Sequence, residues 1–122
     1  MKSRYMYYNN NPWDLNEEDC VCRAIAQALG IKYEAVNNLL EAIAELNECD
    51  KLCVCCYHRL LEEIFGLKVI YSHGETVGEV SRTHPGHKLL IRTEGHLTCS
   101  MYGVVIDTWD CTKEIVDCFW TV

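Results

Sequence analysis

The chain has 122 residues, 49% of them hydrophobic, which suffices for one core, and we expect a single domain over residues 1–122. Its 18 acidic residues outnumber its 11 lysines and arginines, and these basic residues are scattered singly, so we expect no nucleic acid partner. No run of about eighteen apolar residues occurs, and the N-terminus lacks the apolar centre of a signal peptide. We therefore expect no membrane partner and a cytoplasmic location.

Nine cysteines are present, and because the number is odd they cannot all pair within the chain. Reduced thiols are the expected state in a chain without a secretory signal. Free cysteine packs readily as a small hydrophobic residue. Most of the cysteines are therefore expected in the core, leaving one or two for chemistry.

The first half of the chain predicts a strand, a loop and helices. Tyr5–Tyr8 has strand character, and Asn9-Asn10-Asn11-Pro12 breaks it into a loop that runs to about Glu18. Apolar residues then recur at helical spacing in three segments: Asp19–Leu29, Tyr33–Leu46 and Lys51–Phe65. Asp19 is expected to cap the first of these helices, and Gly30 is expected to end it.

The second half predicts strands, in these segments: Leu67–Tyr71, Lys88–Arg92, His96–Met101, Val104–Asp107 and Ile115–Trp120. Tyr102-Gly103 is expected to join the third and fourth as a hairpin. The polar stretch from residue 72 to residue 87, which carries His73, His84 and His87, is expected to be a loop. Because helices precede the strands, we expect an α+β fold with N-terminal helices packed on a C-terminal antiparallel sheet.

Cys20 stands at the start of the first expected helix, in the segment Asp19-Cys20-Val21-Cys22-Arg23-Ala24. The unpaired N–H groups and the dipole of a helix N-terminus lower the pKa of a thiol, which is about 8.5 in free cysteine. Cys20 is therefore a candidate nucleophile, and the alternative is a buried core cysteine. Cys22 should point roughly 200° away from Cys20 around the helix, so it is not expected to share the same cleft.

His96 and Asp107 lie on the two strands of the expected hairpin. If the turn centres on Met101-Tyr102, His96 lies directly opposite Asp107, whereas a shift in register places it opposite one of the two residues that follow Asp107. Opposed and diagonal residues are about 5 to 8 Å apart at Cβ, within side-chain reach. Asp107 can then accept a hydrogen bond from the His96 ring and fix its tautomer. Asp110 is a weaker candidate, because it lies beyond the expected strand end.

Several segments of the chain resemble small papain-like cysteine peptidases, of the minimal kind that bacteriophages and bacteria encode. The segments are Tyr7–Pro12, Asp19–Ile25, Thr76–Gly86, and Gly95–Thr98 with Asp107–Asp110. The more specific of them are Asp19-Cys20-Val21-x-Arg23-Ala24 and Asp107-Thr108-Trp109-Asp110.

This resemblance implies a papain-like fold with Cys20 as the nucleophile, His96 as the general base and Asp107 as the residue that orients the base. It also implies an amide upstream of the nucleophile that helps to bind the oxyanion. Asn9 and Asn11 are the amides available there, and the backbone N–H of Cys20 is the expected second donor.

We therefore expect a thiol hydrolase that cleaves an amide, isopeptide or related acyl bond of a peptide or protein, without a cofactor or metal. One alternative is a catalytically silent domain of the same fold that binds a host protein. The other is a zinc-binding interaction protein, because the ligand types suit zinc in Cys49, Cys53, Cys55, Cys56 and His58. This segment has only one Cys-x-x-Cys pair, so we expect Cys49, Cys53 and Cys56 to form one core-facing stripe instead.

Overall fold

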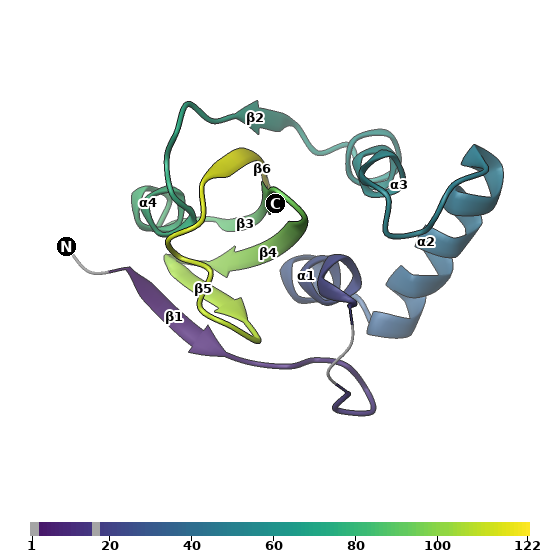
Figure 1. The fold of residues 1–122 in the computed structure, drawn as a ribbon, viewed down its shortest axis with the longest axis horizontal. Helices are drawn as coiled ribbons and strands as arrows, with labels where there is room; N and C mark the ends of the chain where they lie inside the picture. Colours follow the sequence, from purple (N-terminus) through teal and green to yellow (C-terminus); the bar gives the residue numbers. More distant parts are fainter. Residues whose placement is uncertain (1–2, 16–17) are drawn as a thin grey trace.

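The computed structural model describes residues 3–15 and 18–122 (Figure 1). Six strands of this part of the chain form one open sheet in the order β1-β5-β4-β3-β6-β2. The strands are β1 Arg4–Tyr7, β2 Val69–Tyr71, β3 Lys88–Thr93, β4 His96–Met101, β5 Val104–Asp107 and β6 Val116–Thr121. The helices are α1 Cys20–Leu29, α2 Tyr33–Asn47, α3 Val54–Arg59, the π-helix η1 Leu60–Ile64, and α4 Val77–Thr83.

Helices cover both faces of the sheet (Figure 1). On one face α1 packs against β4 and β3, and α2 packs against α1 on the side away from the sheet (Figure 1). α3 places Tyr57 against Trp120 of β6, and this layer encloses the larger core. On the other face α4 places Val80 in a smaller core. Successive strand residues point to opposite faces. Leu90 and Trp120 therefore join the larger core, while their neighbours Ile91 and Phe119 join the smaller one.

The expected combination of helices and a sheet is confirmed, but the expectation of a purely antiparallel sheet is wrong. β1 runs parallel to β5 and pairs Arg4 with Val104 and Tyr7 with Asp107, whereas the other neighbouring strands run antiparallel. A parallel pair needs a long connection, and the helices and strands between β1 and β5 in the chain provide it. The pairing brings the end of β1 beside Asp107.

α1 begins at Cys20, one residue after the predicted start, and Asp19 occupies the N-cap position as predicted, but the predicted side-chain cap hydrogen bond does not form. The Asp19 carboxylate instead accepts hydrogen bonds from Arg23 Nε at 2.6 Å, Asn11 Nδ2 at 2.9 Å and the Tyr33 hydroxyl at 2.8 Å. Because Asp19 is buried, a cation and two polar donors satisfy its charge better than one backbone N–H would.

The third predicted helix is divided into α3 and η1, and it starts at Val54 rather than Lys51. The N–H of Phe65 donates to the carbonyl of Leu60, five residues earlier, at 3.0 Å. This wider turn accompanies two neighbouring leucines, Leu60 and Leu61, that are both fully buried. By contrast, Gly30 ends α1 as predicted, with a φ of +66° in the left-handed region that glycine adopts freely.

The prediction of a loop over residues 72–87 is wrong in its middle, where α4 forms. The Thr76 hydroxyl accepts from the backbone N–H of Glu79 at 3.2 Å, and the Glu79 carboxylate accepts from the N–H of Thr76 at 3.1 Å. This capping box is readable in the sequence Thr-x-x-Glu, although Gly78 argues against a helix there. The structure requires glycine, because a Cβ at residue 78 would collide with Ser3.

The predicted hairpin of β4 and β5 is confirmed with its bounds. Tyr102 and Gly103 have φ values of +52° and +86°, as in a type I′ turn, and the residues that flank the turn pair directly. Continuing this register places Thr98 opposite Asp107 and His96 diagonal to it. Of the registers that the sequence left open, the structure has the one shifted by two residues, and it keeps His96 within reach of Asp107.

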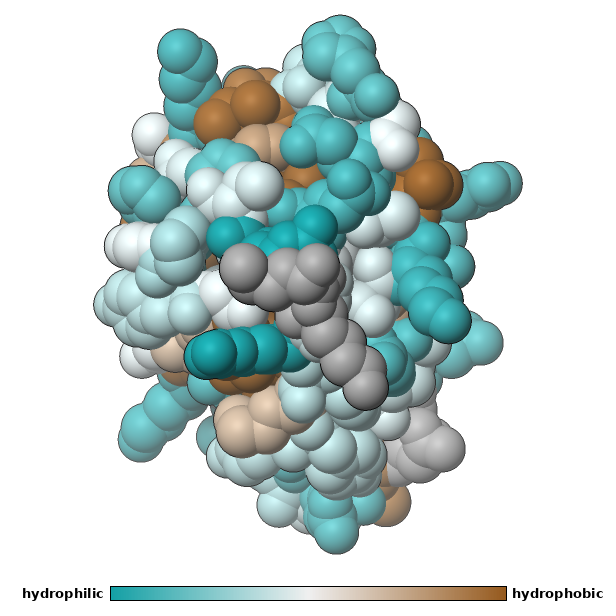
Figure 2. Space-filling model, turned by 90° about the vertical axis from the view of Figure 1, so that its left-hand side faces the viewer, coloured by the Kyte–Doolittle hydropathy of each residue, from teal (hydrophilic) through white to brown (hydrophobic). Residues whose placement is uncertain are grey.

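The surface over β1 and α4 is mainly hydrophilic. Figure 2 shows hydrophobic side chains on this face only in small separate groups among the described residues. None of the helices in the described part of the chain combines the length and apolar character that crossing a bilayer requires.

Candidate active site

A cleft of about 870 Å³ is lined by the start of α1 and the start of β4. Cys20 and His96 both line it, as does Trp109 from the segment after β5. Leu52, from the segment that joins α2 and α3, and Val54, the first residue of α3, also line the cleft. The structure thus places the predicted nucleophile and the predicted base in one cleft that is open to solvent.

The environment of Cys20 lowers its pKa below that of an ordinary thiol. Burial acts in the opposite direction and raises the pKa, but hydrogen bonding to the His96 side chain and to the backbone of Leu97 outweighs it. The nearby positive charges of His96 and Arg23 contribute in the same direction. A lowered pKa increases the fraction of thiolate, the form that acts as a nucleophile.

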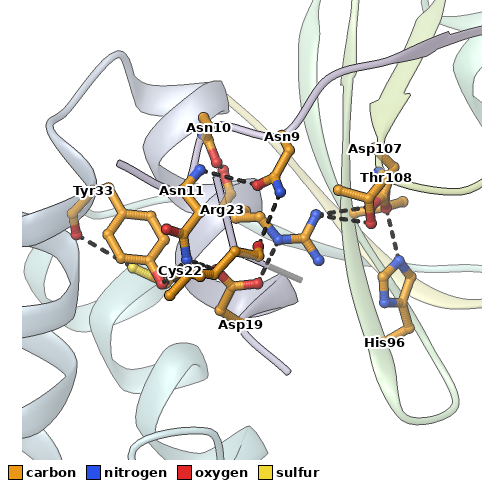
Figure 3. Close-up of polar contacts among 12 residues, drawn as sticks. Asn9, Asn10, Asn11, Asp19, Cys22, Arg23, Tyr33, His96, Asp107 and Thr108 are labelled. Atoms are coloured by element: carbon orange, nitrogen blue, oxygen red, sulfur yellow. Dashed lines mark hydrogen bonds and ion pairs between the residues drawn. The ribbon is translucent and has the colours of Figure 1, made fainter. Parts of the chain in front are cut away.

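His96 is held by Asp107 across the hairpin. Its Nε2 lies 2.7 Å from Oδ2 of Asp107, and its ring centroid is 5.0 Å from that of Trp109 (Figure 3). Burial lowers the pKa of His96, but hydrogen bonds with Asp107, Cys111 and Cys20 outweigh burial and raise the pKa to about 11. With Nε2–H donated to Asp107, Nδ1 is the ring nitrogen left to exchange a proton with Cys20.

Asp107 is a buried carboxylate surrounded by donors. Besides His96, Oδ2 accepts from the hydroxyl of Thr98 at 2.6 Å, and Oδ1 accepts from the N–H of Thr108 at 2.7 Å. Burial raises the pKa of Asp107, but the hydrogen bonds from His96 and Thr98 outweigh burial and lower the pKa to about 2. The carboxylate is therefore ionised near neutral pH and keeps its ring partner in one orientation.

Arg23 links the start of α1 to the carboxylate behind His96, and sequence reasoning missed this role. Its Nη1 is 3.2 Å from Oδ1 of Asp107, while its Nε donates to Asp19 at 2.6 Å (Figure 3). Arg23 and both carboxylates are buried. The spacing of Asp19 and Arg23 suggests an ion pair on one helix face. Nothing in the sequence reveals the contact with Asp107, because that contact depends on how α1 packs against the hairpin.

Asn9 and Asn11, the predicted oxyanion donors, are not brought into the cleft. The amide nitrogen of Asn9 donates to the carbonyl of Leu15 at 3.0 Å, and that of Asn11 donates to Asp19 at 2.9 Å. Neither side chain is among the residues that line the cleft. In this structure both amides hold the loop before α1 in place, so they are not positioned to bind an oxyanion beside Cys20.

Asp110, Cys22 and Cys111 lie next to the site residues in the chain or in space. Asp110, the weaker candidate partner for His96, accepts hydrogen bonds from the N–H and hydroxyl of Thr112 at 3.1 and 2.7 Å. The buried Cys22 contacts the carbonyl oxygen of Tyr33 at 3.3 Å and does not line the cleft, as its helical position predicts. Cys111 was not predicted. Its buried Sγ lies 3.8 Å from Asp107 Oδ2.

Two groups in the described part of the chain have potential metal-ligating atoms within 4.8 Å of one another. One consists of His96, Asp107 and Cys111, and the other contains Cys49, Cys53 and Cys55. In the first group, protein donors already surround the Asp107 carboxylate. The second group is an all-thiol cluster away from Asp107, and its ligand type suits a thiophilic metal.

We expect acid to destabilise the protein through Asp107. Its pKa is about 2 in the folded state and about 3.9 when unfolded. The contribution of the Asp107 carboxylate to the free energy of unfolding is therefore fully present above about pH 4 and is lost as the pH falls through about 2. The expected loss in the free energy of unfolding is roughly 2 kcal/mol. Urea unfolding at a series of pH values measures it, and Asp107→Asn should flatten this part of the profile. If the free energy of unfolding of Asp107→Asn fell as steeply in acid as that of wild type, Asp107 would not be the source of the acid sensitivity.

Comparison with protein-family models, curated proteins and solved structures finds no match to this chain in any of the three. The geometry and electrostatics around Cys20 and His96 are therefore the basis on which a function is proposed.

Proposed function

We propose that the chain is a papain-like thiol hydrolase that cleaves an amide, isopeptide or related acyl bond in a peptide or protein. The observation that supports this best is the lowered pKa of Cys20 in an open cleft beside His96, which is itself bound to Asp107. A core cysteine has no need of an imidazole or of access to a cleft. The chain order of nucleophile, base and carboxylate is also that of the family the sequence resembles.

In the proposed reaction the Cys20 thiolate attacks the carbonyl carbon of the substrate, and the carbonyl electrons move to its oxygen. The backbone N–H of Cys20, at the first position of α1, is free of helical bonding and is one donor for this oxyanion. When the intermediate collapses, the bond to the leaving group breaks and that group takes a proton from His96. Water then gives a proton to His96 and attacks the thioester, which releases the acid and regenerates Cys20.

The test is the order in which the thiols react. Brief treatment with limiting iodoacetamide near neutral pH, followed by mass-spectrometric mapping, should modify Cys20 before the other cysteines. Exposure alone would favour Cys55, which is exposed whereas Cys20 is only partly so, but hydrogen bonding to Cys49 raises the pKa of Cys55 to about 11. The order therefore separates thiolate chemistry from simple access.

Cys20→Ser is the matched control and should abolish the early modification without exposing another cysteine. If Cys55 were alkylated rapidly while Cys20 stayed unmodified, the hydrolase proposal would be contradicted. That result would favour a catalytically silent domain that uses the cleft to bind another protein.

A further inference from the structure

Four cysteine side chains converge between the end of α2 and the start of α3. Sγ of Cys49 lies 3.1 Å from Sγ of Cys55 and 3.0 Å from Sγ of Cys56, and Sγ of Cys55 lies 3.1 Å from Sγ of Cys53. These residues form the thiol cluster. The expected stripe of Cys49, Cys53 and Cys56 is confirmed: Cys56 is buried in the larger core, and Cys49 and Cys53 pack against that core. Cys55 is exposed.

The sulfur atoms of the thiol cluster are in hydrogen-bond contact and are not joined as disulfides. Their separations exceed the length of a disulfide bond, which is about 2.05 Å, by roughly 1 Å. Sulfur ligands of a tetrahedral ion with bonds of about 2.3 Å lie roughly 3.8 Å apart, a distance compatible with the spacing of the Cys49, Cys53 and Cys55 sulfur atoms, which lie within 4.8 Å of one another. We propose that Cys49, Cys53 and Cys55 bind one zinc ion, and that Cys56, whose Sγ contacts that of Cys49, completes the shell as the fourth thiolate ligand.

The backbone around the thiol cluster is held independently of any metal. The N–H of Cys49 donates to the carbonyl of Ala44 in α2 at 3.0 Å, and the N–H of Cys53 donates to the carbonyl of Asp50 at 2.9 Å. The Sγ of Cys56 also contacts the carbonyl of Asp50 at 3.3 Å. The loop between the helices therefore brings the thiols of Cys49, Cys53 and Cys55 together and places Cys56 beside Cys49, as the proposed zinc site requires.

The thiol cluster is separate from the neighbouring histidine. Nδ1 of His58 lies 2.8 Å from Glu62, and its Nε2 lies 2.7 Å from Arg92, so both ring nitrogens face other partners. His58 is consequently left out of the proposed ligand set, although its residue type suits zinc. Four thiolates complete a tetrahedral shell without it.

The position of the thiol cluster gives the ion a structural role. Leu52 lies between two of the proposed ligands in the chain, and so does Val54, and both residues line the cleft that contains Cys20. An ion bound to the cluster would link the end of α2 to the start of α3 and hold this part of the cleft wall. It would have no part in the chemistry at Cys20.

Metal analysis of protein purified without chelator tests the site. About one zinc per chain is expected, and both Cys53→Ser and Cys55→Ser should make the content substoichiometric. Cys20→Ser is the matched control: it also removes one partly exposed thiol, but it should keep the full zinc content. Retention of zinc by both cluster variants would overturn the proposal, as would a stoichiometric ion of another kind.

A second measurement covers variants that fail to fold. Cobalt(II) added to wild-type protein after chelator treatment should produce the intense visible absorption of a tetrahedral thiolate complex, and zinc should displace it. Absence of these bands would overturn the proposal. So would an intact mass, measured after anaerobic purification, that shows the cluster thiols paired as disulfides.

Discussion

Replacing His96 by alanine is expected to slow alkylation of Cys20 near neutral pH by roughly tenfold or more. The reason is electrostatic: hydrogen bonding to His96 is the largest of the contributions that lower the pKa of Cys20, and burial would then raise that pKa unopposed by the imidazole. The helix dipole alone contributes only about 0.3–1 kcal/mol when exposed. Measuring the alkylation rate of Cys20 against pH should show its inflection shifted to higher pH in the variant.

Variants at Asp107 and Asp110 show whether the carboxylate acts through His96. Asp107→Asn keeps an oxygen that can accept from the ring, so it should preserve more of the Cys20 reactivity than Asp107→Ala does. Asp110→Ala is the matched control, because Asp110 bonds to Thr112 and should leave the rate unchanged. If Asp110→Ala slowed the alkylation of Cys20 and Asp107→Ala left its rate unchanged, the orienting role would belong to Asp110.

Replacing Arg23 by alanine is expected to lower the free energy of unfolding by about 3–5 kcal/mol. The substitution leaves two buried carboxylates, Asp19 and Asp107, without their shared cation. Urea denaturation measures the loss. Because Asp19 and Asp107 bind protons more readily without Arg23, the difference in the free energy of unfolding between wild type and the variant should shrink as the pH falls.

Arg59→Ala is the matched control for Arg23→Ala. Arg59 pairs with Glu63 at 2.9 Å with the same helical spacing, but both side chains are exposed. Exposed pairs of this kind contribute about 0–1 kcal/mol, so this variant should remain close to wild type. If both variants lost the same free energy of unfolding, burial would not be what makes the ion pairs of Arg23 contribute more to stability than that of Arg59.

The hairpin was predictable because its signals are local. Tyr102-Gly103 lies between two runs of strand-forming residues, and the bounds of β4 and β5 agree with the prediction. The exact register was not predictable, since it depends on which residues occupy the left-handed positions of the turn. α4 was missed for the opposite reason. Gly78 lowers helix propensity locally, while the close approach of Ser3 that demands glycine exists only in the folded chain.

The sequence by itself determined that Cys20 begins a helix and that His96 and Asp107 share a hairpin, because these features follow from the spacing of nearby residues. Only the tertiary structure decided that the helix packs with Cys20 in the same cleft as His96 and with Arg23 against Asp107. Tertiary structure also decided that the Asn9 and Asn11 amides donate to Leu15 and Asp19, in and next to the loop before α1, and do not line the cleft. Such contacts join residues far apart in the chain, and the burial that makes them strong arises only when the core forms.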